Sequence, residues 1–135
     1  FLTELEDSAP TLDDIAELTK NVRYLIDTNR TDSGSTSGFP LLATTVRLLF
    51  HDCCGGCDGC ININNEDNNG LLYAIQELER EYSTNFTTIM SRTDFWAAAG
   101  TVAWLYGVEI SYGKNFDADS DYVPSMDYYW GRSDC

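Results

Sequence analysis

The chain has 135 residues, of which 43% are apolar, so it can bury a packed core and is not a disordered chain. Its 22 acidic residues outnumber 8 Lys and Arg, and the net charge of −14 repels phosphate backbones, which argues against a nucleic-acid partner. No apolar run reaches the roughly 18 residues of a membrane span, and we expect residues 1–135 to form a single domain.

The first half of the chain predicts an arm and two helices. Residues 1–10 are acidic and end at a proline, which is typical of an extended arm. Thr11 and the aspartates after it form a helix start, and apolar residues at helical spacing continue it over 12–28. The polar stretch 31–38 predicts a flexible loop, and the proline after it suits the first turn of a second helix over 40–53.

The second half predicts two more helices and an irregular end. An Asn-rich run over 62–69 predicts irregular structure, and apolar residues then mark a third helix over 70–83. A fourth helix over 93–106 contains small residues that allow close helix packing. Residues 108–135 predict a loop-rich tail with an acidic loop at 117–121. The predicted fold class is therefore all-α.

The cysteines and the glycosylation sequons indicate where the protein works. The chain contains five cysteines, Cys53, Cys54, Cys57, Cys60 and Cys135, and the odd number leaves one thiol free or paired with another chain. Two Asn-x-Ser/Thr sequons begin at Asn29 and Asn85, and the sequence starts at Phe1 rather than Met. Together these features favour a secreted, extracellular glycoprotein. The cysteines at 53–60 also suit zinc or an iron–sulfur cluster, although a contiguous run in an oxidising compartment favours disulfides.

Arg47 and His51 are the candidate catalytic pair. They are four residues apart in the second predicted helix, so their side chains lie on one face. A guanidinium beside an imidazole suits cleavage of a peroxide O–O bond, because the imidazole moves a proton from one oxygen to the other. The guanidinium stabilises the charge on the departing oxygen.

The wider sequence resembles the distal half of the plant-type haem peroxidases. The similarity begins with Arg-Leu-Leu-Phe-His-Asp-Cys at 47–53 and Gly-Cys-Asp-Gly at 56–59. It continues, in family order, with Asn-Asn-Gly-Leu at 68–71, Ser-Arg-Thr-Asp at 91–94 and Trp-Gly-Arg-Ser-Asp at 130–134. The resemblance implies the distal, N-terminal half of the all-helical peroxidase fold, with haem b as cofactor, hydrogen peroxide as oxidant and a small-molecule reductant that the sequence does not name.

The resemblance assigns roles to individual residues of the haem site. His51 is implied as the distal acid–base residue, Arg47 as the distal cation and Phe50 as the side chain that packs on haem and limits access to the iron. Asn68 is implied to accept the second ring N–H of His51 and so to fix its tautomer.

The same resemblance implies a calcium site and a structural ion pair. Asp52 and Asp58, with the backbone carbonyl of Gly56, are implied as ligands of a distal Ca²⁺, which prefers oxygen ligands. Asp94 and Arg132 are implied as an ion pair between the start of the fourth helix and the tail.

The cysteine loop departs from the family pattern. The family pairs the cysteines at positions 53 and 57, which stand one residue closer here than usual. Cys60 replaces a serine ligand of calcium with a poorer one. Cys54 and Cys60 are additional cysteines that we expect to be able to bond to each other.

The family also needs a proximal histidine, and the one histidine of this chain is assigned to the distal side. Three explanations stay open: a second polypeptide that carries the proximal half, joined through Cys135; a fragment; or a degenerate peroxidase. The alternative function is a non-catalytic secreted peroxidase-like protein in a matrix, in adhesion or as a ligand carrier. The joint presence of Arg47, Phe50, His51 and Asn68 favours catalysis.

Overall fold

The computed structural model describes residues 9–29, 40–113 and 128–135. In these ranges the chain forms only helices: α1 (Leu12–Thr28), α2 (Leu41–Gly55), the short 3-10 helix η1 (Glu66–Asn68), α3 (Leu72–Asn85) and α4 (Arg92–Tyr112). The predicted all-α class is confirmed. The polar stretch 31–38, the acidic loop 117–121 and most of the N-terminal arm lie outside the described residues.

Helix α1 has the predicted bounds because its first turn is capped on both sides. The Thr11 hydroxyl accepts the backbone N–H of Asp14 at 3.2 Å, and the Asp14 carboxylate accepts the backbone N–H of Thr11 at 2.8 Å. The Thr11 hydroxyl also donates to the Asp14 carboxylate at 2.6 Å, and this hydrogen bond, together with the one from the Thr11 backbone N–H, lowers the pKa of Asp14. Leu18, Val22 and Ile26 form the buried stripe of the helix.

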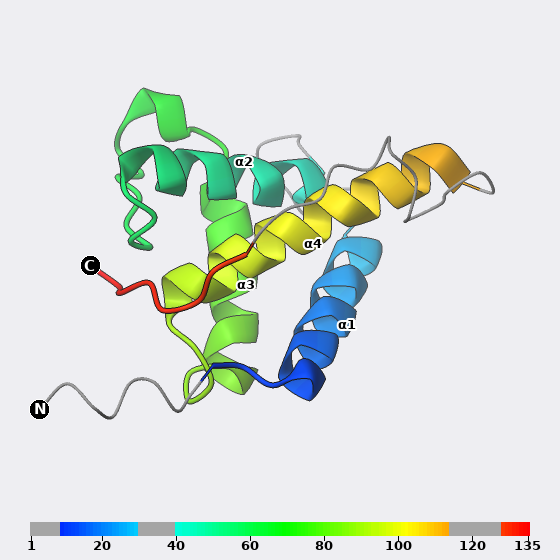
Figure 1. Cartoon of the computed structure of the whole chain (residues 1–135). Coiled ribbons are helices and arrows are strands. Elements are labelled where there is room, and N and C mark those ends of the chain that lie inside the picture. The colour runs from blue at the N-terminus through cyan, green and yellow to red at the C-terminus, as the bar shows by residue number, and fades with distance from the viewer. Residues whose placement is uncertain (1–8, 30–39, 114–127) are drawn as a thin grey trace, which may run out of the picture.

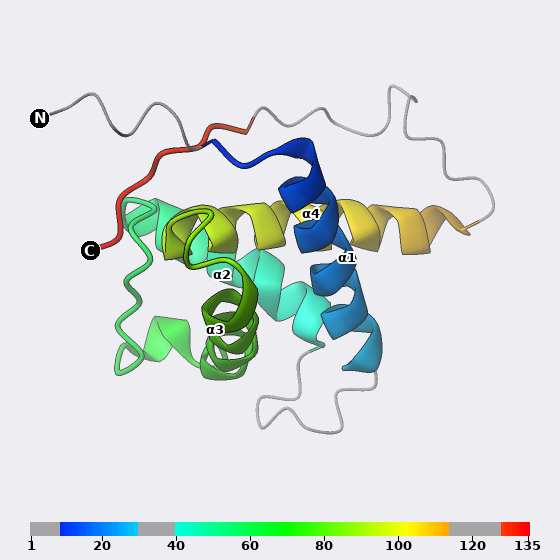
Figure 2. The same ribbon diagram turned by 90° about the horizontal axis from the view of Figure 1, so that it is seen from below.

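Helix α4 is longer than predicted and is the central element of the fold. The sequence predicted its end near residue 106, whereas it continues to Tyr112 and ends at Gly113, whose φ is 56°. In Figures 1 and 2, α4 runs the length of the described part, and α1, α2 and α3 each contact it. A Cβ on Gly100 would lie 2.5 Å from the Leu49 side chain, so this glycine lets α2 and α4 approach closely.

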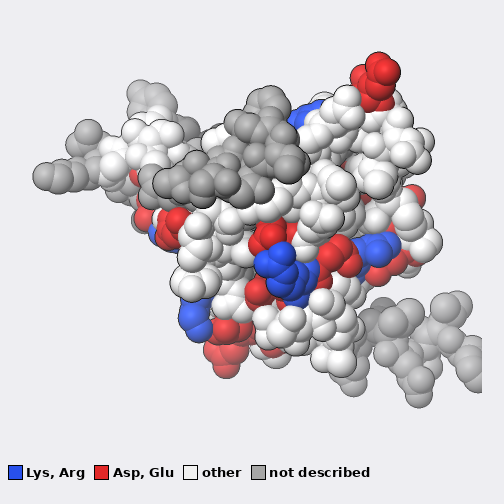
Figure 3. All heavy atoms as spheres, turned by 180° about the vertical axis from the view of Figure 1, so that it is seen from behind, with Lys and Arg blue, Asp and Glu red and all other residues white. Residues whose placement is uncertain are grey.

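One core lies among the four helices, with Leu48 of α2, Leu78 of α3 and Phe95 of α4 fully buried in it. On the surface in Figure 3, acidic and basic side chains are intermixed, and no basic patch forms on that face of the described residues. No helix in the described ranges is long and apolar enough to cross a bilayer.

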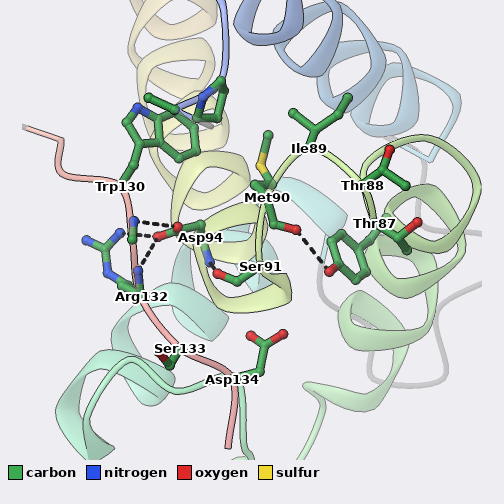
Figure 4. A pocket seen from close by; sticks show the side chains of 14 residues that line it. Thr87, Thr88, Ile89, Met90, Ser91, Asp94, Trp130, Arg132, Ser133 and Asp134 are labelled. Atoms are coloured by element: carbon green, nitrogen blue, oxygen red, sulfur yellow. Dashed lines mark hydrogen bonds and ion pairs between the residues drawn. The ribbon is translucent and has the colours of Figure 1, made fainter. Parts of the chain in front are cut away.

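The C-terminal segment, residues 128–135, is fastened to the start of α4. The Asp94 carboxylate accepts hydrogen bonds from Arg132 Nη1 at 2.9 Å and from the backbone N–H of Gly131 at 2.8 Å. Figure 4 shows Arg132 and Ser91 on either side of Asp94, at the edge of a hollow of about 570 Å³. The predicted ion pair between Asp94 and Arg132 is confirmed.

Candidate active site

Arg47 and His51 lie one turn apart on α2, as their spacing predicted. The opposite side of this helix is anchored in the core, where Thr44 and Leu48 are buried, so the helix cannot rotate without losing that packing. Arg47 and His51 are half-buried. Phe50, next to His51, is 66% exposed and presents its ring edge-on to the imidazole.

The tautomer of His51 is set by Asn68. The Nδ1 atom of His51 lies 2.7 Å from the side-chain oxygen of Asn68, while the Asn68 amide nitrogen donates to the backbone carbonyl of Asn62 at 2.9 Å. Because the amide nitrogen is engaged with a carbonyl, the amide oxygen faces the ring and can only accept. His51 Nδ1 therefore carries the hydrogen, and in the neutral imidazole Nε2 keeps its lone pair.

Arg47 is held by the residues on either side of Asn68. Its Nη1 donates to the carbonyl of Asn69 at 2.6 Å, and its Nη2 donates to the carbonyl of Asp67 at 2.5 Å. A guanidinium has five N–H groups, so further donors remain for a ligand after these two contacts. The two side chains are thus oriented by one short segment, in which the resemblance implied the role of Asn68 but not those of its two neighbours.

A family model described as peroxidase matches residues 19–135, which include α2, α3, α4, the C-terminal segment and the part of α1 from Thr19 onward. The chain belongs to the peroxidase family. Within it, the match is to the plant-type haem peroxidases, whose members typically depend on haem. No curated protein and no solved structure shows significant similarity to the chain. The helices described above are consistent with a part of the helical peroxidase fold.

The residues around Phe50 fit one face of a haem. A flat macrocycle needs an apolar wall with a few polar groups placed over it. Phe50, Val46, Leu49 and Trp104 line an apolar hollow of about 420 Å³ between α2 and α4, and Arg47 and His51 project from the same helix. These residues would hold the distal face, with His51 Nε2 bonded to none of the described residues.

Asp52 and its loop fit a cation. Asp52 is 2% exposed, and burial raises its pKa, with the nearby charge of Asp58 adding to the effect and the N–H of Gly59, 2.9 Å from Oδ1, opposing it. The second oxygen faces the Thr93 hydroxyl at 3.3 Å, but that single hydroxyl hydrogen has a closer acceptor in the Cys57 carbonyl at 2.7 Å. No basic side chain of the described residues forms an ion pair with Asp52, so an ionised Asp52 lacks an opposite charge.

Asp58 lies close enough to Asp52 for its charge to act on that carboxylate, whereas no contact places the Gly56 carbonyl there. Asp58 accepts the backbone N–H of Cys60 at 3.1 Å. Gly56 is the C-cap of α2 at a φ of 132°, and the structure shows no contact that tests its carbonyl as a ligand. Two neighbouring carboxylates with carbonyl oxygens are a suitable donor set for Ca²⁺.

Two of the expectations about cysteines are wrong. Cys60 is bonded to Cys135 rather than to Cys54, and Cys135 is therefore not available for a bond to another chain. The physical reason is the C-terminal segment, which runs beside the cysteine loop and places the Cys135 N–H 2.9 Å from the carbonyl of Asp58. The implied pair Cys53–Cys57 is present, and the exposed Cys54 is the unpaired cysteine.

The disulfide pairing argues against a zinc or iron–sulfur site at the cysteines of residues 53–60. Zinc or a cluster would need several thiolates, whereas four of the five cysteines are in disulfides. Asp58, Cys60 and Cys135 do lie close together, but two of these three are disulfide sulfurs, which are poor ligands.

Sequence reasoning missed two features around the site. It did not identify the carbonyls of Asp67 and Asn69 as partners of Arg47, because backbone groups carry no residue signal. It also included Asp134 in the motif at 130–134 without giving it a role, whereas its carboxylate accepts the backbone N–H groups of Arg92 and Thr93 at 3.0 and 2.8 Å. The final acid of that motif was the available signal.

Proposed function

We propose that this chain provides the distal, acid–base side of a haem peroxidase, which reduces hydrogen peroxide and oxidises a small-molecule donor. The observation that carries the proposal is the hydrogen bond between His51 Nδ1 and Asn68, because it leaves the Nε2 lone pair ready to accept a proton. A histidine on an ordinary helix surface has no need of an amide that is itself fixed by a backbone carbonyl.

Haem, when bound, supplies the iron that receives the peroxide and its oxidising equivalents. The chain's own residues move the proton. His51 Nε2 would accept the proton of one peroxide oxygen, and the resulting imidazolium would be stabilised by its Nδ1–H···O contact with Asn68. The same Nε2–H then donates to the other oxygen, which leaves as water.

Arg47 contributes electrostatically to the same step. Its guanidinium keeps donors free after its contacts with Asp67 and Asn69, and it is pre-oriented by those two carbonyls. A cation already in place stabilises the charge on the departing oxygen without a reorganisation cost at the moment of reaction. The exposed ring of Phe50 restricts the approach of bulky donors to the iron.

The proximal side of the haem must come from residues outside these 135, since the one histidine is His51. We place that part, carried by a second polypeptide or by further sequence, against the apolar surface formed by α2 and α4. Phe50, Trp104 and Ile110 lie along this surface, and the unpaired Cys54 is at its edge. A disulfide to a second polypeptide would therefore use Cys54.

A secreted location with glycans at Asn29 or Asn85 and a Ca²⁺ at Asp52 and Asp58 completes the proposal. The two disulfides support the secreted location, because disulfides persist in oxidising compartments.

The test uses protein purified from its natural source, where any partner chain is retained. We expect a Soret band that shifts when hydrogen peroxide is added, and a histidine-containing second segment in the peptide map. Gels with and without reductant identify a disulfide-linked chain. A protein that shows no Soret band, even after haem is added, contradicts the proposal and favours the non-catalytic alternative.

A further inference from the structure

We propose that Asn65 is a positioning residue for peroxide cleavage, because it holds the one turn that orients both Arg47 and His51. The inference rests on the proposed function and adds a residue that the sequence did not indicate. It concerns the turn at residues 66–69, which consists of η1 and the residue after it.

This turn makes three hydrogen bonds to the two side chains of the site. Two carbonyls, from Asp67 and Asn69, accept from the Arg47 guanidinium, and the Asn68 side chain between them binds the His51 imidazole. Since the three partners are consecutive residues, a shift of the turn moves the guanidinium and the imidazole contacts together. The turn therefore couples the positions of the two groups.

Asn65 stabilises this turn by hydrogen bonds from its side chain and its backbone. The side-chain oxygen of Asn65 accepts the backbone N–H of Asp67 at 3.1 Å, as the N-cap of η1. Its backbone carbonyl accepts the N–H of Asn68 at 2.9 Å, and its own N–H bonds to the carbonyl of Asn62 at 3.0 Å. A side-chain cap matters here because a single 3-10 turn has few hydrogen bonds of its own.

Asn65 is also the residue through which the turn can be altered selectively. The carbonyls that bind Arg47 belong to the backbone and cannot be removed by substitution. Asn65 is exposed, so its replacement leaves no cavity. The neighbouring Asn64 is equally exposed, and its side chain makes no hydrogen bond with the described residues, which makes it a matched control.

The test compares Asn65→Ala, Asn65→Ser and Asn64→Ala in the recombinant full-length protein. The first readout is ¹⁵N NMR of the His51 imidazole, whose signals are identified by their absence from the spectrum of His51→Leu. We expect the Nδ1–H tautomer in the parent and in Asn64→Ala, and a mixture of tautomers in Asn65→Ala. Asn65→Ser should restore the single tautomer, because serine also caps.

The second readout is the stopped-flow rate of the haem-loaded protein with hydrogen peroxide. We expect Asn65→Ala to be slower by about 10- to 10²-fold, the latter being the loss that a 1 Å misplacement can cause. Asn64→Ala should react at the parent rate. If Asn65→Ala does not fold, Asn65→Gly removes the same acceptor at a smaller cost to the turn.

Each outcome decides the inference. An Asn65→Ala or Asn65→Gly variant with the parent's tautomer and rate overturns it. A parent that does not react with peroxide defeats the proposed function, while the tautomer comparison still shows whether Asn65 positions His51.

Discussion

Two aspartates, Asp52 near the end of α2 and Asp94 at the start of α4, are almost equally buried, but only Asp94 has a basic partner among the described residues. Asp94 receives a guanidinium from Arg132 as well as two backbone N–H groups. Asp52 receives one backbone N–H and faces a shared hydroxyl, with no basic partner among the described residues. Arg132 of the same chain compensates the charge of Asp94, whereas the charge of Asp52 would be compensated only by a bound cation.

The same difference extends to the surroundings of each aspartate. In the C-terminal segment, the Tyr128 hydroxyl, Nη1 of Arg132 and the Asp134 carboxylate are all hydrogen-bonded within the chain. On α2, the Nε2 atom of His51 and part of the Arg47 guanidinium have no such partners in the described residues. Polar groups that the fold satisfies act on stability, and those that it positions but leaves unsatisfied are the ones available for chemistry.

The largest effect should be that of His51→Leu on the reaction rate. It tests whether the polar groups on α2 act on chemistry rather than on stability. We expect the rate with hydrogen peroxide in the haem-loaded protein to fall by about 10²–10⁴-fold, toward the upper end because one group acts as both base and acid. Arg47→Leu should cost roughly 10²–10³-fold, since it removes charge stabilisation but no proton transfer. Stopped-flow absorbance at the Soret band measures both.

The thermal stability of both α2 variants should stay close to that of the parent, because neither side chain is fully buried. If both variants react at the parent rate, the pair has no catalytic role and the proposed function fails.

Arg132→Met should have the opposite profile, with a large loss of stability and no change in the rate per folded molecule. Removal of the guanidinium leaves Asp94 buried with only backbone donors, and we expect a loss of about 3 kcal/mol, the low end for a broken buried pair. Urea denaturation measures the loss. Arg80→Met is the control, because the pair between Arg80 and Glu77 is largely exposed on the arginine side and should be worth about 0–1 kcal/mol. Equal losses in the two variants would contradict the comparison.

The ion pair between Asp94 and Arg132 is one of the features that could be predicted from the sequence. The helices were predictable because buried side chains recur at helical spacing, and α1 had both its stripe and its capping residues in view. The motif containing Arg47 and His51 placed both residues on one face, and the family pattern anticipated the contact with Asn68 and the partner of Asp94.

What the sequence did not predict depends on tertiary placement. The bond between Cys60 and Cys135 joins residues 75 positions apart, and only the path of the C-terminal segment brings them together. The end of α4 was missed because Gly107 is a weak helix former, yet the helix continues where this glycine packs closely against Leu42. The contacts of Arg47 are to backbone carbonyls, which no residue pattern reveals.

Calcium should stabilise the protein through Asp52 and not through Asp94, and the melting temperature tests this difference. We expect EDTA to lower the melting temperature, and Ca²⁺ but not Mg²⁺ to restore it, because Mg²⁺ demands an octahedral geometry that this loop suits poorly. At a Ca²⁺ concentration 100 times the Kd, the stabilisation is about 2.7 kcal/mol. Asp52→Asn should abolish the response, while Asp13→Asn, an exposed change on α1, should retain it.

A melting temperature that is the same with EDTA and with Ca²⁺ in the parent would mean that Asp52 is not a ligand. The contrast with Asp94 would then rest on hydrogen bonds alone.

The smallest effect concerns Tyr128, which fastens the C-terminal segment by donating to the carbonyl of Asp94 at 2.5 Å. Tyr128→Phe should cost about 1 kcal/mol near neutral pH, the usual net value of one hydrogen bond.

Burial above all, with the charge of Asp94 second, raises the pKa of Tyr128 well above its ordinary range. The unfolded chain loses the phenol proton near pH 10, whereas the folded chain retains it, so the free energy of unfolding should fall as the pH rises above about 10. The Phe variant lacks this contribution and should fall less steeply, which narrows the gap between the two proteins. Burial also raises the pKa of Tyr82, but both proteins contain it, and their difference isolates Tyr128. Urea denaturation at neutral pH and at about pH 11 measures the gap, and a gap that stays constant would show that the Tyr128 phenol is as free to ionise in the folded chain as in the unfolded one.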